Sequence, residues 1–495
     1  MTTTKKPKKQ KLRNAEYYDL QAMFDKLYSE SKNGKTFTKI MPIILSENNI
    51  RLAYRNLKRN SGSRTAGTDH KTIKDLETWK EPDLVRYVRK RLEWYIPQPV
   101  RRVEIAKDNG KTRPLGIPTI QDRLIQQCFL QVLEPICEAK FHDRSFGFRP
   151  NRSQENAVAV AYSLMQIQHL HFVVDLDIKG FFDNVSHGKL LRQMWALGIR
   201  DKTVLSTLSA MLKAEVAGIG FPEKGTPQGG IISPLLSNIV LNELDWWISS
   251  QWETMPMRKN YVRTRKDNGV AEKTYAYKVL REKSRLKECY GLRYADDFRI
   301  FCRRRQDAEK LFIATRKWLK ERLGLDISPE KSQIVNLKRK YSEFLGFKMM
   351  VKPNGKSGSK TRYTVVSHVS EKRKKKIKKR ASELVAKIKF PADKFEEHKF
   401  IMDYNSYVMG IHNYYSMATH ANQDFSEIGF SVKRTMKCRL GQRLKKSGNS
   451  LPQYVQEKYG RSKELRYIRG LFVLPISYVQ TRAPKHRPRN WCVYT

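Results

Sequence analysis

The sequence has few cysteines, and none of them stands at a spacing that binds zinc. The six cysteines lie far apart, no two form a C-x-x-C pair, and no cluster of histidines accompanies them. A structural zinc site is therefore not expected. Thiols scattered within apolar segments are typical of reduced, buried cysteines in an intracellular protein.

Long apolar runs are also missing. No run reaches the ~18–20 residues that a membrane-spanning helix needs. The basic residues 1–13 are not followed by the apolar region of a signal peptide. We therefore expect no membrane partner and an intracellular location, in the cytoplasm or nucleoid of a bacterium or within an organelle.

Acidic residues are scarce. The 495 residues include 49 Asp and Glu against 97 Lys and Arg, which gives a formal net charge of +48. Such an imbalance opposes compaction by self-repulsion unless a polyanion relieves it, so nucleic acid is the leading partner and an anionic membrane surface the second. The length predicts two to four domains.

Some of the scarce carboxylates gather where they are costly to place. Asp296 and Asp297 interrupt an apolar stretch at 291–302 and are expected at the tip of a hairpin, where they need a cation. Upstream, Asp175 and Asp177 alternate with the apolar residues of a predicted strand and point to one side. Carboxylates on separate strands suit two Mg²⁺ ions that handle phosphates. Taken alone, the pair Asp175 and Asp177 also fits a solvated strand edge, an interpretation that the second Asp pair weakens.

Periodicity and turn residues outline the rest of the chain. A strand pair joined by a tight turn is predicted at 101–118, and a strand at 344–351. Residues 253–290 look like a polar, basic insertion. Helices are predicted at 119–140, 187–213, 233–252 and 305–323, and three more between 371 and 447.

Seven blocks, in order over most of the chain, resemble those of group II intron-encoded reverse transcriptases, also called maturases. The GFRPNRS and PQGGIISPLLSN strings favour this family over retroviral, retron or diversity-generating relatives. The blocks are RPLGIPTIQDRLIQQ (113–127), FHDRSFGFRPNRS (141–153), VVDLDIKGFFDN (173–184), GTPQGGIISPLLSNIVLNELD (225–245), YADD (294–297), LGLDISPEKS (323–332) and FLGF (344–347).

The resemblance implies an α+β fold, a right-hand polymerase with fingers and palm. It divides the chain into an RNA-binding N-terminal helical extension at 1–98, fingers and palm at 99–350 with the insertion 253–290, a three-helix thumb or domain X at 366–447, and a small basic DNA-binding region at 448–495. The family's HNH endonuclease pattern does not follow, so we expect no nicking of target DNA by this polypeptide.

The resemblance also implies which residues carry the chemistry. Asp177 is preferred to Asp175 because the family's metal ligand opens the D-I-K-G-F-F-D block. Two Mg²⁺ ions, with Mn²⁺ as a substitute, would be held at Asp177, Ile178, Asp296 and Asp297. Lys331 matches a lysine proposed to protonate the leaving pyrophosphate.

Contacts to the incoming dNTP are implied at Lys107, Arg113, Ile178, Phe182 and Gln228. Lys107 and Arg113 would bind the triphosphate, and Lys111 in the same turn could share this role. For each of them, a solvated surface charge is the competing interpretation. A ring at Phe182 would exclude a 2′-OH, unless it is simply a core residue like Phe181.

The first thumb helix carries eight Lys or Arg within ten residues. Phosphate binding is preferred to a merely solvated helix face, and the residues expected to contact nucleic acid are Lys372, Arg373, Lys375, Lys376, Lys379 and Arg380. Gly346 matches the hairpin that supports the primer end. Tyr404, Tyr407, Tyr414 and Tyr415 recur at near-helical spacing and are expected to pack rather than stack on bases.

The implied function is RNA-directed DNA synthesis for a group II intron, with binding of the intron RNA to assist splicing and retrohoming by target-primed reverse transcription. The expected partners are the intron RNA, an RNA template with a DNA primer, target DNA and dNTPs, bound by a monomer or homodimer. Two alternatives are a non-catalytic RNA-binding splicing factor and a domesticated reverse transcriptase in repair or defence.

Overall fold

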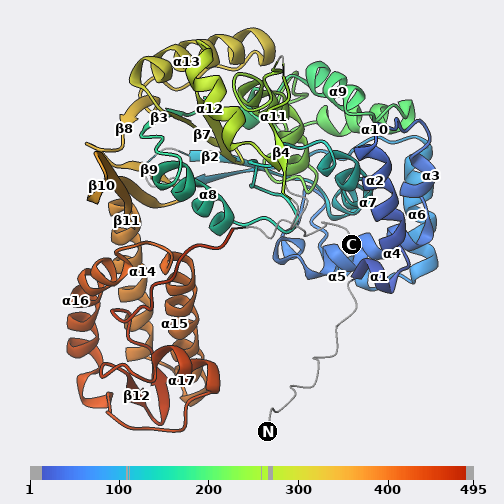
Figure 1. The fold of residues 1–495 in the computed structure, drawn as a ribbon. Helices are drawn as coiled ribbons and strands as arrows, with labels where there is room; N and C mark the ends of the chain where they lie inside the picture. The colour runs from blue at the N-terminus through green and yellow to red at the C-terminus, as the bar shows by residue number, and fades with distance from the viewer. Residues whose placement is uncertain (1–13, 107–109, 111, 258, 266–270, 487–495) are drawn as a thin grey trace, which may run out of the picture.

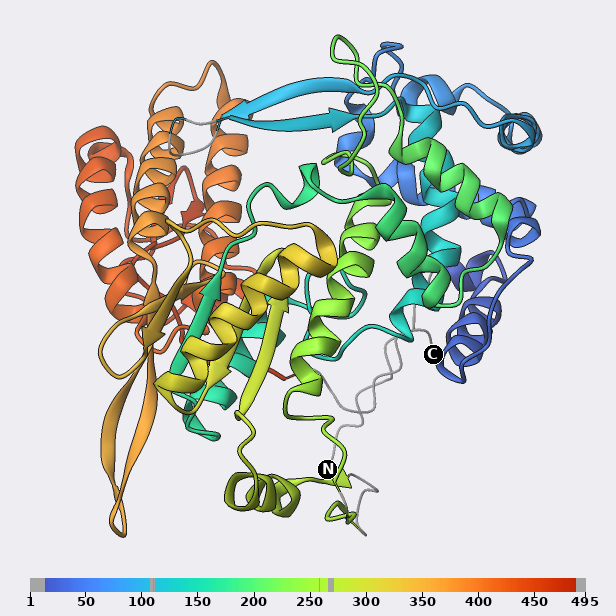
Figure 2. The same cartoon turned by 90° about the horizontal axis from the view of Figure 1, so that it is seen from above.

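The structure, a computed structural model, describes residues 14–106, 110, 112–257, 259–265 and 271–486. The N-terminal part is helical and packs around the long, buried α7 (Ile120–Glu138), which confirms the helix predicted at 119–140. The other helices here are α1 (Asn14–Tyr17), α2 (Gln21–Lys32), α3 (Met41–Ile44), α4 (Glu47–Arg59), α5 (Ile73–Glu77) and α6 (Glu81–Glu93). The predicted strand pair is also present, as β1 (Arg101–Ala106) and β2 (Thr112–Ile117). It is an antiparallel hairpin that projects from these helices (Figure 2).

A four-stranded antiparallel sheet lies at the centre of the molecule, in the order β6-β7-β3-β8. The strands are β3 (Phe172–Leu176), β6 (Cys289–Tyr294), β7 (Asp297–Cys302) and β8 (Gln333–Asn336). Consecutive residues of β7 are buried on both alternations, so both faces of this strand are covered. The covering helices are α8 (Gln154–Gln166), α11 (Ser233–Ser250) and α13 (Arg305–Trp318), the last of which ends in a π-helical turn at Leu319–Leu323 (Figure 1).

Two helical predictions need correction. The single helix predicted at 187–213 is wrong, because the chain forms α9 (His187–Ala196) and α10 (Lys202–Leu212). Gly198 takes a φ of +106° between them, and the Asp201 side chain accepts the N–H groups of Thr203 and Val204 to begin the second helix. The insertion 253–290 contains β4 (Arg263–Thr264), β5 (Ala271–Glu272) and a helix, α12 (Thr274–Lys283), that periodicity did not predict.

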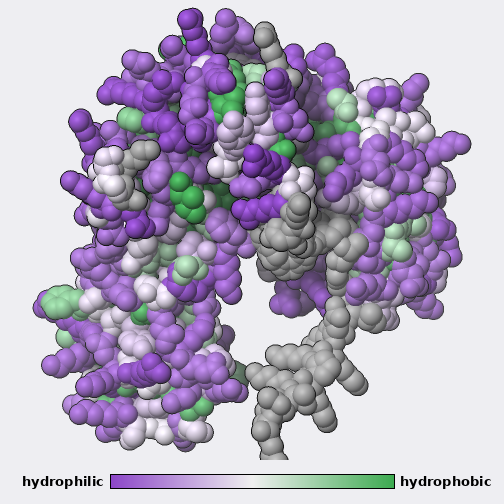
Figure 3. All heavy atoms as spheres, viewed as in Figure 1, coloured by the Kyte–Doolittle hydropathy of each residue, from purple (hydrophilic) through white to green (hydrophobic). Residues whose placement is uncertain are grey.

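A separate lobe follows the sheet. The strand predicted at 344–351 is instead β9 (Ser342–Phe344), a turn at Leu345 and Gly346, and β10 (Phe347–Ser357), which pairs with β11 (Lys360–Val369). The three predicted helices are confirmed as α14 (Glu371–Lys389), α15 (Lys394–Tyr415) and α16 (Ala421–Leu440). Figure 3 shows an open gap between this lobe and the N-terminal helices, and a mostly hydrophilic surface.

The segment after α16 packs onto the same lobe. It contains α17 (Gln453–Tyr459), β12 (Arg466–Ile468) and β13 (Leu471–Val473). The Asn405 amide of α15 donates to the Phe472 carbonyl and accepts the Leu474 N–H, and His412 hydrogen-bonds Tyr459 and the Ile476 carbonyl. Burial lowers the pKa of His412 to about 4. Residues 453–476 therefore share the core of the three helices.

Several smaller expectations can be compared directly. Tyr404 and Tyr415 are buried packing residues, as predicted. Four cysteines are buried free thiols, but Cys438 is exposed, contrary to the expectation of uniformly buried thiols. Within the described residues, no helix is both long enough and apolar enough to span a bilayer.

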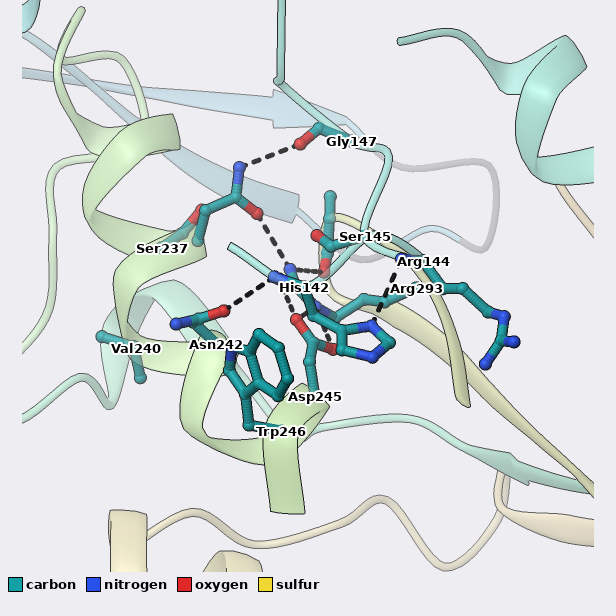
Figure 4. A network of polar contacts seen from close by, with 12 residues as sticks. His142, Arg144, Ser145, Gly147, Ser237, Val240, Asn242, Asp245, Trp246 and Arg293 are labelled. Carbon is teal, nitrogen blue, oxygen red and sulfur yellow. Dashed lines mark hydrogen bonds and ion pairs between the residues drawn. The ribbon is translucent and has the colours of Figure 1, made fainter. Parts of the chain in front are cut away.

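A buried guanidinium fixes the hairpin between β6 and β7 (Figure 4). Arg293 donates from Nε and Nη2 to the Asp245 carboxylate of α11 at 2.7–3.0 Å. Its Nη1 donates to the Asn238 side chain at 2.9 Å and to the Ala295 carbonyl at 2.8 Å. These hydrogen bonds satisfy the Arg293 and Asp245 charges and the Ala295 carbonyl. A buried charge or carbonyl without a partner would destabilise the folded state.

The loop 141–149 packs against the same hairpin. Its backbone pairs with β6, since the Phe146 N–H donates to the Arg293 carbonyl and the Arg293 N–H donates to the Arg144 carbonyl, both at 2.9 Å. Gly147 then lies so close to the turn that an added Cβ would stand 2.2 Å from the Ala295 nitrogen. Asn238 donates to the Gly147 carbonyl, and Arg149 is held by a buried Glu138 carboxylate.

We predict that Arg293→Met destabilises the fold by about 3–5 kcal/mol, because it leaves the Asp245 charge buried and unpaired. The double variant Arg293→Met with Asp245→Leu should recover much of that loss. Urea unfolding measures both, with Arg305→Met, which removes an exposed ion pair to Glu309, as the control within about 0.5 kcal/mol of the unaltered chain. Equal stability of the Arg293→Met and Arg305→Met chains would contradict the prediction.

A second prediction concerns Gly147. Gly147→Ala should cost about 1–3 kcal/mol, because its methyl group meets backbone that cannot move without shifting the turn. Gly188→Ala, in α9, is the matched control, because no atom lies within 4 Å of the added carbon and alanine favours a helix. Thermal unfolding should separate the two variants, and parallel behaviour would refute the clash.

Candidate active site

The Asp296–Asp297 pair stands at a two-residue hairpin turn, as predicted. Tyr294 pairs with Asp297 across the turn, and Ala295 takes a φ of +58°. A positive φ is unfavourable for alanine, so the surrounding contacts must hold the turn in place. The Asp296 side chain is exposed, and Asp297 is half-buried at the first position of β7.

The strand register brings the upstream carboxylates to the same place. β3 and β7 are antiparallel, with Asp175 opposite Arg299 and Leu176 opposite Phe298. Continued one residue past the end of the ladder at Leu176, the same register aligns Asp177 with Asp297, and the two charges lie close enough to interact. Since directly opposite residues share a face and alternate residues repeat it, all four charged residues lie on one side of the sheet.

Asp177 lies just beyond the end of β3 and is tied to the loop 328–332. The Ser328 N–H donates to the Asp177 carbonyl at 2.7 Å, and the Asp177 N–H donates to the Ser332 hydroxyl at 3.2 Å. These bonds bring Lys331 Nζ to 3.0 Å from the Asp177 carboxylate. The next residue, Ile178, is buried and bridges to Ile327.

Asp175 has a different environment. It is buried, and its carboxylate is 2.5 Å from Arg299 Nη1, which is also 2.5 Å from the Asp297 carboxylate. Burial raises the pKa of Asp175 to about 6, and the neighbouring Asp297 and Asp177 add to the rise while Arg299 opposes it. The two upstream carboxylates therefore differ, because Asp175 is enclosed with an arginine and Asp177 is 44% exposed.

The donor set is of the type that Mg²⁺ prefers, since every candidate is a carboxylate oxygen. Burial raises the pKa of Asp297, and the Asp296 and Asp177 charges contribute, which indicates carboxylates close enough to gain from a shared cation. Among the described residues, no three or more His, Cys, Asp or Glu side chains are gathered tightly enough to hold a metal ion. The Asp177 carboxylate pairs with Lys331, and the Asp297 carboxylate pairs with Arg299.

The structure also brings several predicted nucleotide contacts together. Arg113 Nε donates to the Gln228 side chain at 2.5 Å. The Thr226 N–H donates to the Phe182 carbonyl at 2.7 Å, so the loop before Gln228 runs beside Phe182. Phe181 is buried, whereas Phe182 is only partly so, which separates the two rings. Lys107 and Lys111 lie outside the described residues.

A cavity of about 380 Å³ adjoins this group, with Val100, Pro114, Gly116, Thr226 and Gln228 among its lining residues. Pro114 and Gly116 alternate with Arg113 along β2, so the cavity lies on the other face of the hairpin. Because Gln228 also lines it, the cavity extends between the hairpin and the loop that accepts the Arg113 hydrogen bond.

The eight basic residues between 372 and 380 in α14 divide into two groups. Lys374 and Lys378 point to α16, where Glu427 accepts both at 2.8 Å and has its pKa lowered to about 2 by these bonds. The other six are exposed: Lys372, Arg373, Lys375, Lys376, Lys379 and Arg380. These are the six residues expected to contact nucleic acid.

One basic residue of the last segment is already engaged within the protein. Arg482 pairs with Glu155 at the start of α8, and its N–H donates to the Ser416 carbonyl at 2.9 Å. The Lys485 N–H also donates to Glu155, and the pKa of Glu155 is lowered mainly by Arg482. This segment links the helical lobe to α8.

Sequence reasoning missed the residues that hold the carboxylates in place. Arg299 sits inside an apolar strand two positions after the Asp pair, and a charge in such a strand was a signal that it needed a buried partner. Arg293 gives the same signal before the turn. Gly147 gave none, because its role depends on a contact 148 positions away, with Ala295.

Comparisons with known proteins now bear on this site. Residues 105–349 match the family model for reverse transcriptase (RNA-dependent DNA polymerase). The chain is 31% identical over 448 residues to the group II intron-encoded protein LtrA of Lactococcus lactis subsp. cremoris, covering 80% of this chain and 73% of that protein. It is 34% identical to protein YkfC of Escherichia coli K12, over 52% of this chain and 68% of that protein.

A more distant relative is the putative COX1/OXI3 intron 2 protein of Saccharomyces cerevisiae, which is 26% identical over 69% of this chain and 42% of that protein. The segment 105–349 that matches the family model contains the four-stranded sheet, both acidic pairs and β2, whereas most of β1 precedes it. From the extent of the match to LtrA, this chain belongs to the group II intron-encoded reverse transcriptases, homologous to intron maturases.

Proposed function

We propose that this chain extends a primer with deoxynucleotides on an RNA template, and that Asp177, Asp296 and Asp297 form its catalytic centre. The observation that carries the proposal is the register of β3 and β7, which, continued one residue past Leu176, aligns Asp177 with Asp297 on one face. Exposed Asp296 precedes Asp297 at the turn. Transfer of a nucleotidyl group needs this kind of charge cluster, because its transition state spreads negative charge over phosphate oxygens.

Two Mg²⁺ ions bound by these carboxylates, with the Ile178 backbone beside them, would supply charge neutralisation and orient the primer 3′-OH. Lys331 has a distinct role. Its ammonium group reaches Asp177 Oδ2 and is 63% exposed, so it can also meet a phosphate oxygen. From Nζ it would donate a proton to the leaving pyrophosphate oxygen.

The incoming dNTP would lie between the hairpin β1–β2 and the loop at Gln228. Arg113 would move from Gln228 to the triphosphate, because a guanidinium binds phosphate oxygens more strongly than a neutral amide. Phe182, partly exposed beside this loop, would exclude a ribose 2′-OH by its bulk. Lys107 is proposed as a second phosphate contact.

The helical lobe would act as the thumb, beside fingers and palm. The turn at Leu345 and Gly346 packs on α15, where Tyr414 donates to the Leu345 carbonyl at 2.8 Å and stacks on Phe347. The Ser370 N–H donates to the Gly346 carbonyl at 2.9 Å, so the turn lies at the start of α14. This turn would support the primer end. The six exposed basic residues of α14 would then meet phosphates of the template–primer duplex.

We also propose that the chain binds its intron RNA, assists splicing and supports retrohoming by target-primed reverse transcription. The N-terminal extension, the thumb and residues beyond 448 would share these contacts with RNA and target DNA. The net charge of +48 supports such broad polyanion binding. Arg482 is left out, because Glu155 already holds it.

Primer extension on an RNA template with Mg²⁺ tests the polymerase assignment. Asp296→Asn should reduce extension about a thousandfold, since removing a metal-ligating charge costs several kcal/mol of transition-state stabilisation. Asp326→Asn is the matched control, because Asp326 is an exposed aspartate that pairs with Lys320. If the unaltered chain does not extend primers, it is a non-catalytic splicing factor.

The same variant separates synthesis from splicing. Asp296→Asn should still bind the intron RNA in which the reading frame lies and should still promote its splicing, because the RNA-binding surfaces are untouched. Equal loss of both activities would show that this separation is wrong. A lack of any effect of the unaltered chain on splicing would favour a reverse transcriptase with another role.

The thumb assignment predicts a change in salt dependence. Lys375→Ala with Lys379→Ala should weaken binding to an RNA–DNA duplex and lower the slope of log K against log salt by about 1 for each lost phosphate contact. Lys310→Ala with Lys317→Ala removes the same charge from exposed positions on α13 and is the control. Equal slopes for the two double variants would contradict duplex binding by α14.

A further inference from the structure

Arg299 contacts the carboxylates of both Asp175 and Asp297 through its guanidinium. It lies on β7, directly opposite Asp175 on β3 and two positions after Asp297, on the face that these residues share. Its Nη1 is 2.5 Å from one oxygen of each carboxylate. A single side chain therefore joins a buried aspartate to a proposed metal ligand.

Two residues of β9 also contact the Arg299 guanidinium. Its Nη2 donates to the Glu343 carbonyl at 2.6 Å, and its carbon lies 5.4 Å from the centre of the Phe344 ring. The side chain is buried, and β9 therefore fixes its position independently of either aspartate. A donor fixed in this way can define where an acceptor sits.

Charge explains why such a donor is needed. Asp175 and Asp297 are diagonal neighbours on adjacent strands, and Asp177 and Asp296 add two more negative charges close by. Without a cation among them, repulsion between these charges would favour an Asp297 side chain that is turned away from its neighbours. The Arg299 bond uses Oδ1 of Asp297, and a carboxylate has further lone pairs for other cations.

We propose that Arg299 is a positioning residue for the metal site: it orients Asp297 for metal binding, and Asp175 is its buried counter-charge. This inference rests on the proposed function, because it takes Asp297 as a metal ligand. Its effect is that of the hydrogen-bond partners that orient ligating side chains in other metal sites. Asp175 balances the arginine, so that Asp297 is held without being neutralised.

A simpler role would be purely structural, in which Arg299 serves only to pair with Asp175 across the sheet. The two roles predict different behaviour when both partners are removed together. A structural pair can be replaced by apolar residues of similar volume without loss. A positioning residue cannot, because Asp297 then loses its donor.

The test uses the full chain without nucleic acid and measures Mn²⁺ binding by electron paramagnetic resonance, with thermal unfolding in metal-free buffer. The variants are Arg299→Met, Asp175→Leu and the two combined. We expect Arg299→Met to weaken Mn²⁺ binding by about tenfold or more, the range seen when an orienting partner is removed. Asp175→Leu alone should weaken Mn²⁺ binding less than Arg299→Met does, because Arg299 still orients Asp297 but has lost its counter-charge.

The double variant decides between the roles. It should unfold close to the temperature of the unaltered chain, because no buried charge is left unpaired, and yet bind Mn²⁺ as weakly as Arg299→Met. Recovery of Mn²⁺ binding together with stability would overturn the proposal. Should Arg299→Met fail to fold, the charge-balanced double variant still gives the answer.

Asp297→Asn distinguishes failure of this inference from failure of the proposed function. It should remove most Mn²⁺ binding. If it does so while the double variant binds normally, only the role of Arg299 is wrong. If Asp297→Asn binds Mn²⁺ as the unaltered chain does, Asp297 is not a metal ligand, and both proposals fall.

Discussion

The buried Arg293 guanidinium sets the position of the acidic turn. It joins three things that lie far apart in the sequence: the carboxylate of Asp245, the amide of Asn238 and the carbonyl of Ala295. Burying an arginine is costly unless every donor is used well. Here the cost is offset by bonds that converge on the turn from behind, while Gly147 packs against it from the side. Asp296 and Asp297 can then project outward on a backbone that would otherwise resist a positive φ at Ala295.

The distribution of charge follows the same logic throughout the chain. Basic residues outnumber acidic ones about two to one, and many of the carboxylates that the structure describes have a cation within reach. Glu427 forms ion pairs with two lysines of α14, Glu155 with Arg482, and Asp177 with Lys331. These pairs leave an excess of exposed positive charge, most visibly on α14. That excess is unfavourable for the isolated chain and favourable beside a polyanion, which fits a protein of a family that acts on RNA.

Much of the fold and of the site could be predicted from the sequence, and the failures have physical causes. Local signals sufficed for the hairpin at 101–118, for the helices at 119–140 and 371–447, and for the Asp296–Asp297 turn. The break at Gly198 was missed because the apolar pattern continues across it, and α12 because only Ala276 and Leu280 of that helix are buried. Arg299 and Arg293 were missed because their partners lie 124 and 48 positions away. Which of Asp175 and Asp177 is enclosed and which reaches solvent depends on such pairings.

Asp175 and Asp177 have identical side chains but different environments, because β3 ends between them. Both point to the same face of the sheet, and alternation alone could not separate them. The hydrogen-bonded ladder ends at Leu176, so Asp175 is enclosed by β7 and β8 and requires a partner supplied by the protein, whereas Asp177 lies past the ladder and meets solvent. Burial raises the pKa of Asp175, and the Arg299 guanidinium beside it opposes that rise. Asp177 pairs instead with Lys331, whose side chain is 63% exposed. The length of β3, rather than the identity of the residue, therefore determines which aspartate is enclosed and which reaches solvent.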